Sequence, residues 1–151
     1  MINSLPHNDV RKRADDVGKY TQCPGTFPIT VIEDTYTPAI MVPDQNITEH
    51  VIWDSTVEVL PTTIFTLTVT DLNGALKFSY QENFCTSSHK PLNIECPIPA
   101  GHLDYKAQYA VLSSPDQPKA QTVETLAKIT LTSLDGTILM CKEGKTSVAF
   151  P

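Results

Sequence analysis

Residues 62–81 read TTIFTLTVTDLNGALKFSYQ, and this stretch decides the fold class. Apolar residues alternate with threonines through 62–70, which is the period of a strand with one buried face. The apolar members are Phe65, Leu67 and Val69. The pair Asn73-Gly74 then predicts a hairpin turn, because both residues tolerate positive φ. Residues 75–81 return as the second strand. The residues on the face that we expect to be buried are Leu76, Phe78 and Tyr80.

The same alternation continues through the rest of the chain, interrupted by prolines and by the turn signal Asp135-Gly136. Thr, Val and Ile each outnumber Ala, a composition that favours strands over helices, and no segment has apolar residues at helical spacing. The further predicted strands are 27–36, 49–60, 103–112, 122–134 and 138–150. About seven strands around one core predict an all-β sandwich or barrel.

Length and charge restrict the function classes. A chain of 151 residues is the size of a single domain. It carries 11 basic and 17 acidic residues, a net charge of −6, and its basic run is limited to Arg11-Lys12-Arg13. Nucleic-acid binding is therefore not expected, because it needs a dense basic surface. No apolar stretch approaches the roughly 20 residues of a membrane-spanning helix, so we expect a soluble protein.

The first 19 residues differ from the rest. Residues 1–19 are polar and have neither helical nor strand periodicity, which predicts a flexible tail or pro-segment ahead of a domain at 20–151. No secretory signal is visible in them. The pair Lys12-Arg13 has the form of a dibasic processing site, and the alternative is a solvated run of charges.

Four cysteines fit two disulfides, with three pairings open. They are Cys23, Cys85, Cys96 and Cys141. One pairing closes a short loop between Cys85 and Cys96 and leaves Cys23 to join Cys141. A metal site is the alternative, but no cysteine lies two to four residues from another, so neither a metal nor a cofactor is expected. The histidines also fall in separate segments; they are His7, His50, His89 and His102. Disulfides indicate an oxidising compartment.

Two further features bear on secretion and on catalysis. The triplet Asn46-Ile47-Thr48 is a glycosylation pattern that also occurs in ordinary polar turns. Catalysis is not expected. Ser87-Ser88-His89 places its groups on one loop, where they rarely face each other, and Glu33-Asp34 points two carboxylates to opposite sides of a strand. No nucleophile elbow or phosphate-binding glycine loop is present.

The most specific motifs lie between Cys85 and Cys141. They are CPIPAG at 96–101, the alternating strand that follows it, and LMC at 139–141 before a last strand that ends in VAF. Over about 20–151 the chain resembles the ML lipid-recognition domain family, and within it the phosphatidylglycerol/phosphatidylinositol transfer proteins. More distant relatives are the Niemann-Pick type C sterol-transfer protein and the lipid-sensing co-receptor of Toll receptors. The sterol-transfer branch has an additional early cysteine pair that this chain lacks, which argues against a sterol ligand.

The resemblance implies an immunoglobulin-like sandwich of two antiparallel sheets that holds a phospholipid or its acyl chains between them. It also implies the pairs Cys23–Cys141 and Cys85–Cys96, and secretion or residence in the lumen of a vacuole- or lysosome-like compartment. A monomer that touches membranes transiently and transfers lipid without covalent chemistry is then expected. The alternative is a secreted immunoglobulin-like interaction module with a closed core.

The candidate lining of a lipid cavity consists of uncharged residues on the inward faces of the predicted strands. They are Val51, Trp53, Phe65, Leu67, Leu76, Phe78, Tyr105, Tyr109, Val111, Ile129 and Leu131. A carrier must shield acyl chains from water, since each buried CH₂ contributes about 0.8 kcal/mol. The same residues could instead interdigitate as a solid core.

Three consecutive apolar residues, Ile40, Met41 and Val42, lie between Pro38 and Pro43, where a sandwich loop is normally polar. One hypothesis places them at the cavity mouth or against a membrane. The alternative is that this segment folds back and caps the core.

Overall fold

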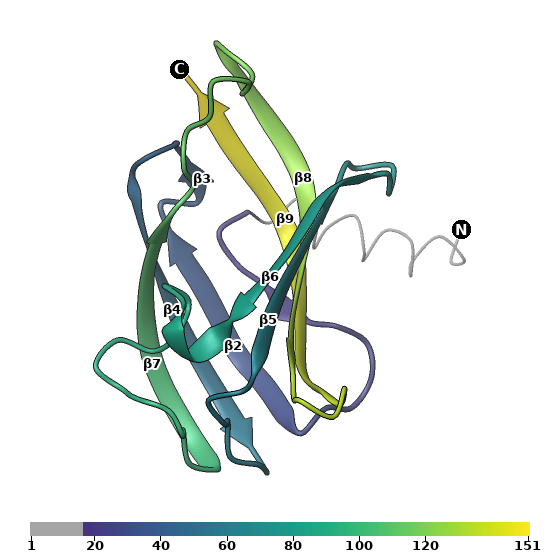
Figure 1. Cartoon of the computed structure of the whole chain (residues 1–151). Helices are drawn as coiled ribbons and strands as arrows, with labels where there is room; N and C mark the ends of the chain where they lie inside the picture. Colours follow the sequence, from purple (N-terminus) through teal and green to yellow (C-terminus); the bar gives the residue numbers. More distant parts are fainter. Residues whose placement is uncertain (1–16) are drawn as a thin grey trace, which may run out of the picture.

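The computed structural model describes residues 17–151, which form nine strands and one short 3₁₀ turn (Figure 1). The two shortest strands are β1 (Thr21–Gln22) and β3 (Ile40–Met41). The longer strands are β2 (Ile29–Thr37), β4 (Asn46–Ser55), β5 (Ile64–Thr70), β6 (Leu76–Asn83), β7 (Gly101–Ala110), β8 (Gln121–Thr132) and β9 (Ile138–Phe150). The 3₁₀ turn η2 (Phe84–Thr86) follows β6. The predicted processing site and most of the predicted tail lie outside the described residues.

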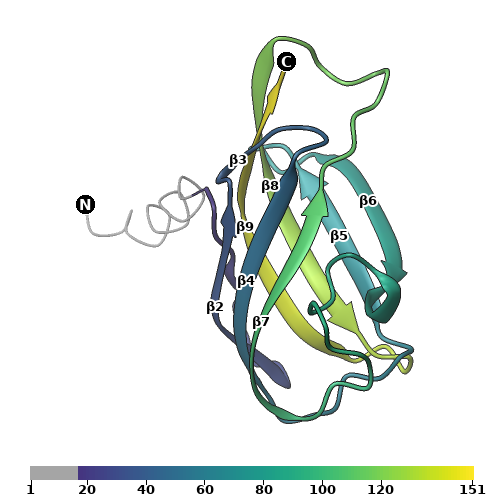
Figure 2. The same cartoon turned by 90° about the vertical axis from the view of Figure 1, so that its left-hand side faces the viewer.

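The strands form two sheets of unequal width that face each other (Figure 2). The larger has the order β1-β9-β8-β5-β6, with β3 also paired to β9, and the smaller has the order β2-β4-β7. All pairs are antiparallel except β3 with β9, which is parallel. The prediction of an all-β sandwich of two antiparallel sheets is confirmed. The seven longer strands are the seven expected, and β1 and β3 are additional.

The hairpin predicted at Asn73-Gly74 joins β5 to β6. Of the two residues, only Gly74 has a positive φ, +92°. The carboxylate of Asp71 accepts hydrogen bonds from the backbone N–H groups of Asn73 (2.8 Å) and Ala75 (3.0 Å). The turn therefore starts at Asp71 and is longer than a two-residue loop. The Asp71 side chain accepts hydrogen bonds from the backbone N–H groups of this longer turn.

One side of the sandwich is closed by the chain itself. Residues 18–20 hydrogen-bond to β2, with Tyr20 N–H donating to the Asp34 carbonyl (3.0 Å) and Tyr36 N–H donating to the Gly18 carbonyl (2.8 Å). The next residues pair with β9 as β1, and a disulfide then joins Cys23 to Cys141 of β9. This segment links the two sheets along their β2 and β9 edges, which we call the closed side.

The opposite side, between β6 and β7, is bridged by the loop 84–100 (Figure 2). A second disulfide joins Cys85 to Cys96 in this loop. Both predicted disulfides are thus confirmed, and they account for every cysteine of the chain, since all four lie in the described residues. On the closed side, one backbone segment runs along β2 and then pairs with β9, whereas the opposite side is spanned by a loop.

The prediction of a buried face on residues 75–81 is wrong. Leu76 is 64% exposed and Phe78 is 51% exposed, and Tyr80 is exposed as well. The register places Phe78 opposite Val69 and Tyr80 opposite Leu67, so these two rings do share the inner face of the sheet. They remain exposed because β6 is an edge strand of the wider sheet and the three-stranded sheet does not extend over it.

The predicted strand 49–60 is also shorter at its end than expected. It ends at Ser55, and Val59 instead forms an isolated bridge with Ile98 across the bottom of the sandwich. Both bridge residues are buried in the core, together with Trp53. Alternation continued to Val59 in the sequence because the loop presents this residue to the same core.

No helix among the described residues has the length and apolar character needed to cross a membrane.

Candidate functional site

A cavity of about 10 Å³ lies between the sheets, which is about the space of one water molecule. Its lining combines apolar side chains with three polar ones. The apolar and aromatic members are Phe65, Phe84, Tyr105, Ile129, Leu131 and Met140, and the polar members are Glu49, His89 and Lys142. In this conformation the interior has no room for an acyl chain at this cavity.

The ammonium group of Lys142 joins the two sheets in the interior. Its Nζ donates to Asp34 Oδ2 (2.6 Å) on β2 and to Glu49 Oε2 (2.8 Å) on β4, and all three side chains are buried. Tyr109 on β7 donates its hydroxyl to Glu49 Oε1 (2.9 Å). The ring of Tyr20 lies 5.3 Å from the same ammonium. We call Asp34, Glu49 and Lys142 the charge cluster.

The charge cluster shifts its own protonation equilibria. Burial raises the pKa of Asp34 well above its usual range. Burial alone would also raise the pKa of Glu49, but attraction to Lys142 and the hydrogen bonds that Glu49 accepts outweigh it and hold its pKa at about 2. For Lys142, burial is outweighed by the two carboxyl groups, so its pKa is raised. The cluster therefore contains a stable Lys142–Glu49 ion pair next to a carboxyl group that resists ionisation.

The imidazole of His89 stands between the sheets on the side opposite the closed side. It stacks on Phe65 of β5, with ring centroids 4.3 Å apart and planes at 11°, and its centroid lies 4.4 Å from that of Tyr109 of β7. Its Nε2 is 3.5 Å from the Tyr80 hydroxyl of β6. Burial lowers the pKa of His89 to about 4, so the ring is neutral at neutral pH.

The structure divides the residues predicted to line a cavity into three groups. Six are buried in the core: Val51, Trp53, Phe65, Tyr105, Ile129 and Leu131. Three are partly buried at its margin: Leu67, Tyr109 and Val111. Leu76 and Phe78 are exposed on β6, as described above. Of the predicted set, the cavity itself is lined by Phe65, Tyr105, Ile129 and Leu131.

The apolar segment between Pro38 and Pro43 forms part of the sheet. Ile40 and Met41 make up β3, which pairs with Ser147 and Val148 of β9. Met41 is 5% exposed and lies in the core, whereas Ile40 is 50% exposed. Met41 therefore caps the core rather than forming an exposed tip, and Val42 is half-buried beside it.

Asn46, the candidate glycosylation residue, is exposed at the start of β4.

Sequence reasoning missed the charge cluster and the position of His89. The available signal was a charged residue at an inward position: Glu49 alternates with the buried residues Ile47 and Val51 on β4. Lys142 likewise follows three buried residues on β9. Glu33 and Asp34 point to opposite sides of β2 as predicted, and Asp34 is the one that lies inside. Which inward charges meet depends on the pairing of the sheets, which spacing along the chain does not give.

Around His89, the loop does not bring a nucleophile to the imidazole. Ser87 Oγ donates to the Phe84 carbonyl (2.8 Å) and accepts from the backbone N–H of His89 (3.1 Å). Among the described residues, no group of three or more His, Cys, Asp or Glu side chains could hold a metal ion. The contacts that the structure shows at this site are hydrogen bonds, ion pairs and apolar packing.

No protein-family model matches the chain, and no curated protein matches it. Solved structures do share its fold. A Niemann-Pick type C2 protein from the Japanese carpenter ant superposes with a TM-score of 0.58 at 12% identity, over 87% of this chain and 98% of that one. The C-terminal domain of wzt gives 0.52 at 9% identity, over 92% and 84%. Chicken MD-1 complexed with lipid IVa gives 0.48 at 16% identity, over 87% and 88%. The first two likenesses establish the immunoglobulin-like sandwich.

Proposed function

We propose that this protein binds an acyl lipid between its two sheets and carries it between membranes, without covalent chemistry. The fold is shared with a Niemann-Pick type C2 protein, and the sequence resembles the ML lipid-recognition family. Two disulfides suit a secreted or lumenal protein. We propose that it acts as a monomer that contacts the membrane only during exchange.

The observation that carries this proposal is an inner sheet face that continues outward past the core. Val69 is buried, and its cross-strand neighbour Phe78 is 51% exposed on the same face. One row along, half-buried Leu67 lies opposite Tyr80, which is 38% exposed. The row continues inward through Ile129 of β8 to Lys142 of β9. An acyl chain lying on this face would have apolar contacts from the surface to the cavity.

The test is whether lipid accompanies the purified protein and whether the exposed part of this face is needed. We expect native mass spectrometry to show a lipid-sized additional mass, and Phe78→Asp to reduce transfer of a pyrene-labelled phosphatidylglycerol between phosphatidylcholine vesicles at least tenfold. Leu134→Asp is the matched control, because Leu134 is 79% exposed in the β8–β9 turn, away from this face. Equal transfer by both variants would overturn the proposal.

A second candidate is an immunoglobulin-like interaction module with a closed core. It is favoured by the size of the cavity, which holds about one water molecule rather than an acyl chain. A module of this kind would be purified without lipid and would transfer none. The same mass spectrum therefore separates the two candidates.

A further inference from the structure

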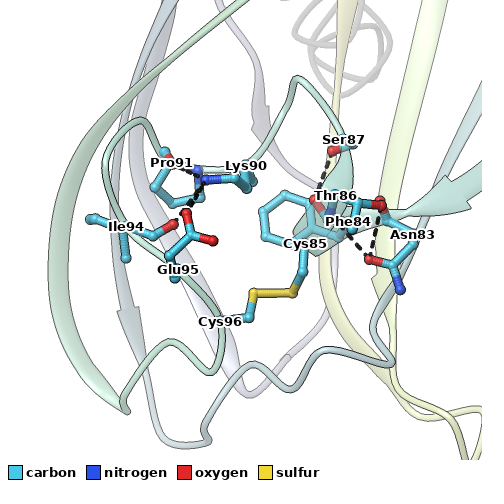
Figure 3. A network of polar contacts seen from close by, with 10 residues as sticks. All are labelled: Asn83, Phe84, Cys85, Thr86, Ser87, Lys90, Pro91, Ile94, Glu95 and Cys96. Atoms are coloured by element: carbon cyan, nitrogen blue, oxygen red, sulfur yellow. Dashed lines mark hydrogen bonds and ion pairs between the residues drawn. A yellow bond between two sulfur atoms is a disulfide. The ribbon is translucent and has the colours of Figure 1, made fainter.

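The loop that carries His89 is held rigidly at both ends. The Cys85–Cys96 disulfide closes it, and Asn83 caps η2 by accepting from the Thr86 N–H (3.2 Å) (Figure 3). Lys90 Nζ donates to the carbonyls of Pro91 (3.2 Å) and Ile94 (3.0 Å) and pairs with Glu95 (3.1 Å). These contacts all lie between residues 83 and 96 and stabilise the conformation of the loop.

The loop is also fixed to both sheets. The backbone N–H of Phe84 donates to the Thr63 carbonyl (2.9 Å) beside β5, and that of Leu92 donates to the Lys106 carbonyl (2.8 Å) on β7. His89 lies between these two anchors. The loop therefore places His89 in the space between β6 and β7, while Phe84 and Ile98 of the same loop pack in the core.

His89 fills a slot between the two sheets. Phe65 belongs to the larger sheet and Tyr109 to the smaller, and the imidazole lies against both rings. The ring also lines the cavity, and its Nε2 is near the Tyr80 hydroxyl at the start of the exposed apolar face. The imidazole thus stands where that face meets the interior.

We propose that His89 closes the route by which an acyl chain reaches the interior, and that protonation of its imidazole releases it and opens the route in acid. This inference rests on the proposed lipid-binding function and specifies its regulation. It accounts for a cavity of only about 10 Å³ between the sheets of a protein proposed to hold lipid.

The charged and titratable groups around the slot favour this response. Tyr80 on β6 and Tyr109 on β7 have raised pKa values, so both remain neutral. Glu49 on β4 attracts a protonated imidazole, and Lys142 on β9 repels it. β5 and β8 contribute apolar side chains, among them Phe65 and Leu131. Burial outweighs the attraction to Glu49, so the slot disfavours the charged ring.

The pKa of the His89 imidazole differs between the slot and water, and this difference decides which state protonation favours. In the slot the pKa is about 4, and in water it is the ordinary 6.5. Protonation therefore favours the state in which the ring is in water. The ratio of open to closed protein rises about tenfold for each pH unit in this window, up to about 300-fold.

Transfer of pyrene-labelled phosphatidylglycerol between phosphatidylcholine vesicles tests the inference at about pH 7.5 and about pH 4.5. We expect the wild type to transfer at least tenfold faster in acid. His89→Phe keeps a neutral aromatic ring in the slot and should be slow at both pH values, and His89→Ala should be fast at both. His102→Phe changes an exposed histidine and should behave as the wild type. His89→Phe leaves the buried carboxyl group of Asp34 in place. If this variant loses the acid response, the response is therefore due to His89 and not to Asp34.

A failure of this inference can be distinguished from a failure of the proposed lipid function. If the probe is transferred but His89→Phe keeps the acid response, the inference is overturned and the lipid function stands. If neither the wild type nor His89→Ala transfers probe at either pH, the proposed function is overturned. A lipid-free measurement guards against variants that do not fold: an NMR titration of wild-type His89 should give a pKa below about 5, and a value near 6.5 would overturn the inference.

Discussion

Lys142 Nζ and Glu49 Oε2 lie 2.8 Å apart in the interior and connect β9 of one sheet to β4 of the other. Both side chains are buried, and Glu49 also accepts a hydrogen bond from Tyr109. An ion pair of this kind adds little stability compared with a well-packed apolar pair, but loss of one partner leaves the other charge buried without compensation. The pair therefore links the two sheets through a buried contact in which each charge depends on the other.

Removal of the ammonium tests this role. We expect Lys142→Met to lower the free energy of unfolding by about 3–5 kcal/mol, because the buried Glu49 carboxylate loses its counter-charge and Asp34 loses its hydrogen-bond donor. Urea unfolding followed by the fluorescence of Trp53 measures it. Lys128→Met, at an exposed position on β8, is the control and should change stability by no more than about 0.5 kcal/mol. Equal stability of the two variants would contradict the assigned role.

The contribution of Glu49 to the free energy of unfolding should depend on pH. Its pKa falls from 4.5 to about 2 on folding, so its contribution is present above pH 4.5 and is lost as the pH falls toward 2. We expect the stability difference between the wild type and Glu49→Gln to shrink by on the order of 3 kcal/mol across this window. Urea unfolding at a series of pH values measures it, and parallel profiles for the two proteins would refute the assignment.

The two disulfides should contribute unequally. Cys23–Cys141 spans 118 residues and Cys85–Cys96 spans 11. In the chain-entropy model, replacing the first pair with alanine costs about 5 kcal/mol and replacing the second costs about 3 kcal/mol. Thermal and urea unfolding of the two double variants check the order. A larger loss for the Cys85–Cys96 variant would show that packing of its loop, rather than loop length, dominates.

Gly144 on β9 lies against the segment that closes one side of the sandwich. A Cβ at this position would meet the Lys19 carbonyl oxygen at 2.6 Å and the Tyr20 ring at 3.1 Å. We expect Gly144→Ala to cost about 1–3 kcal/mol through displacement of residues 18–20. Hydrogen exchange of the Tyr20 amide, which bonds to Asp34, should accelerate. Unchanged protection of this amide would argue against the close approach.

Local sequence patterns predicted the strands well. Alternation in 62–70 and the Asn73-Gly74 signal located the β5–β6 hairpin, and 138–150 matches β9, because period and turn chemistry are properties of neighbouring residues. Alternation also assigned Phe78 correctly to an inner face. It could not show that this face is left uncovered, since coverage depends on the number of strands in the opposite sheet.

The candidate site depends on longer-range geometry. The charge cluster draws Asp34, Glu49 and Lys142 from three strands in two sheets, and their approach depends on sheet packing that the sequence does not state. His89 comes from a loop with no period, where sequence patterns carry the least information. Among the predicted lining residues, Phe65 and Leu131 reach the cavity because they occupy the same row of the larger sheet.

The two long edges of the sandwich are constrained very differently. Residues 18–23 tie β2 to β9 through backbone hydrogen bonds and a covalent bond, and the charge cluster lies near the same edge. Along the β6 and β7 edges, contact between the sheets is made by side chains and by the loop that carries His89. Separation of the sheets is therefore expected to occur as a rotation about an axis parallel to β2 and β9. Such a rotation would increase the interior volume and leave the strand-to-strand hydrogen bonds intact, while breaking one of the two backbone anchors that fix the loop to the sheets.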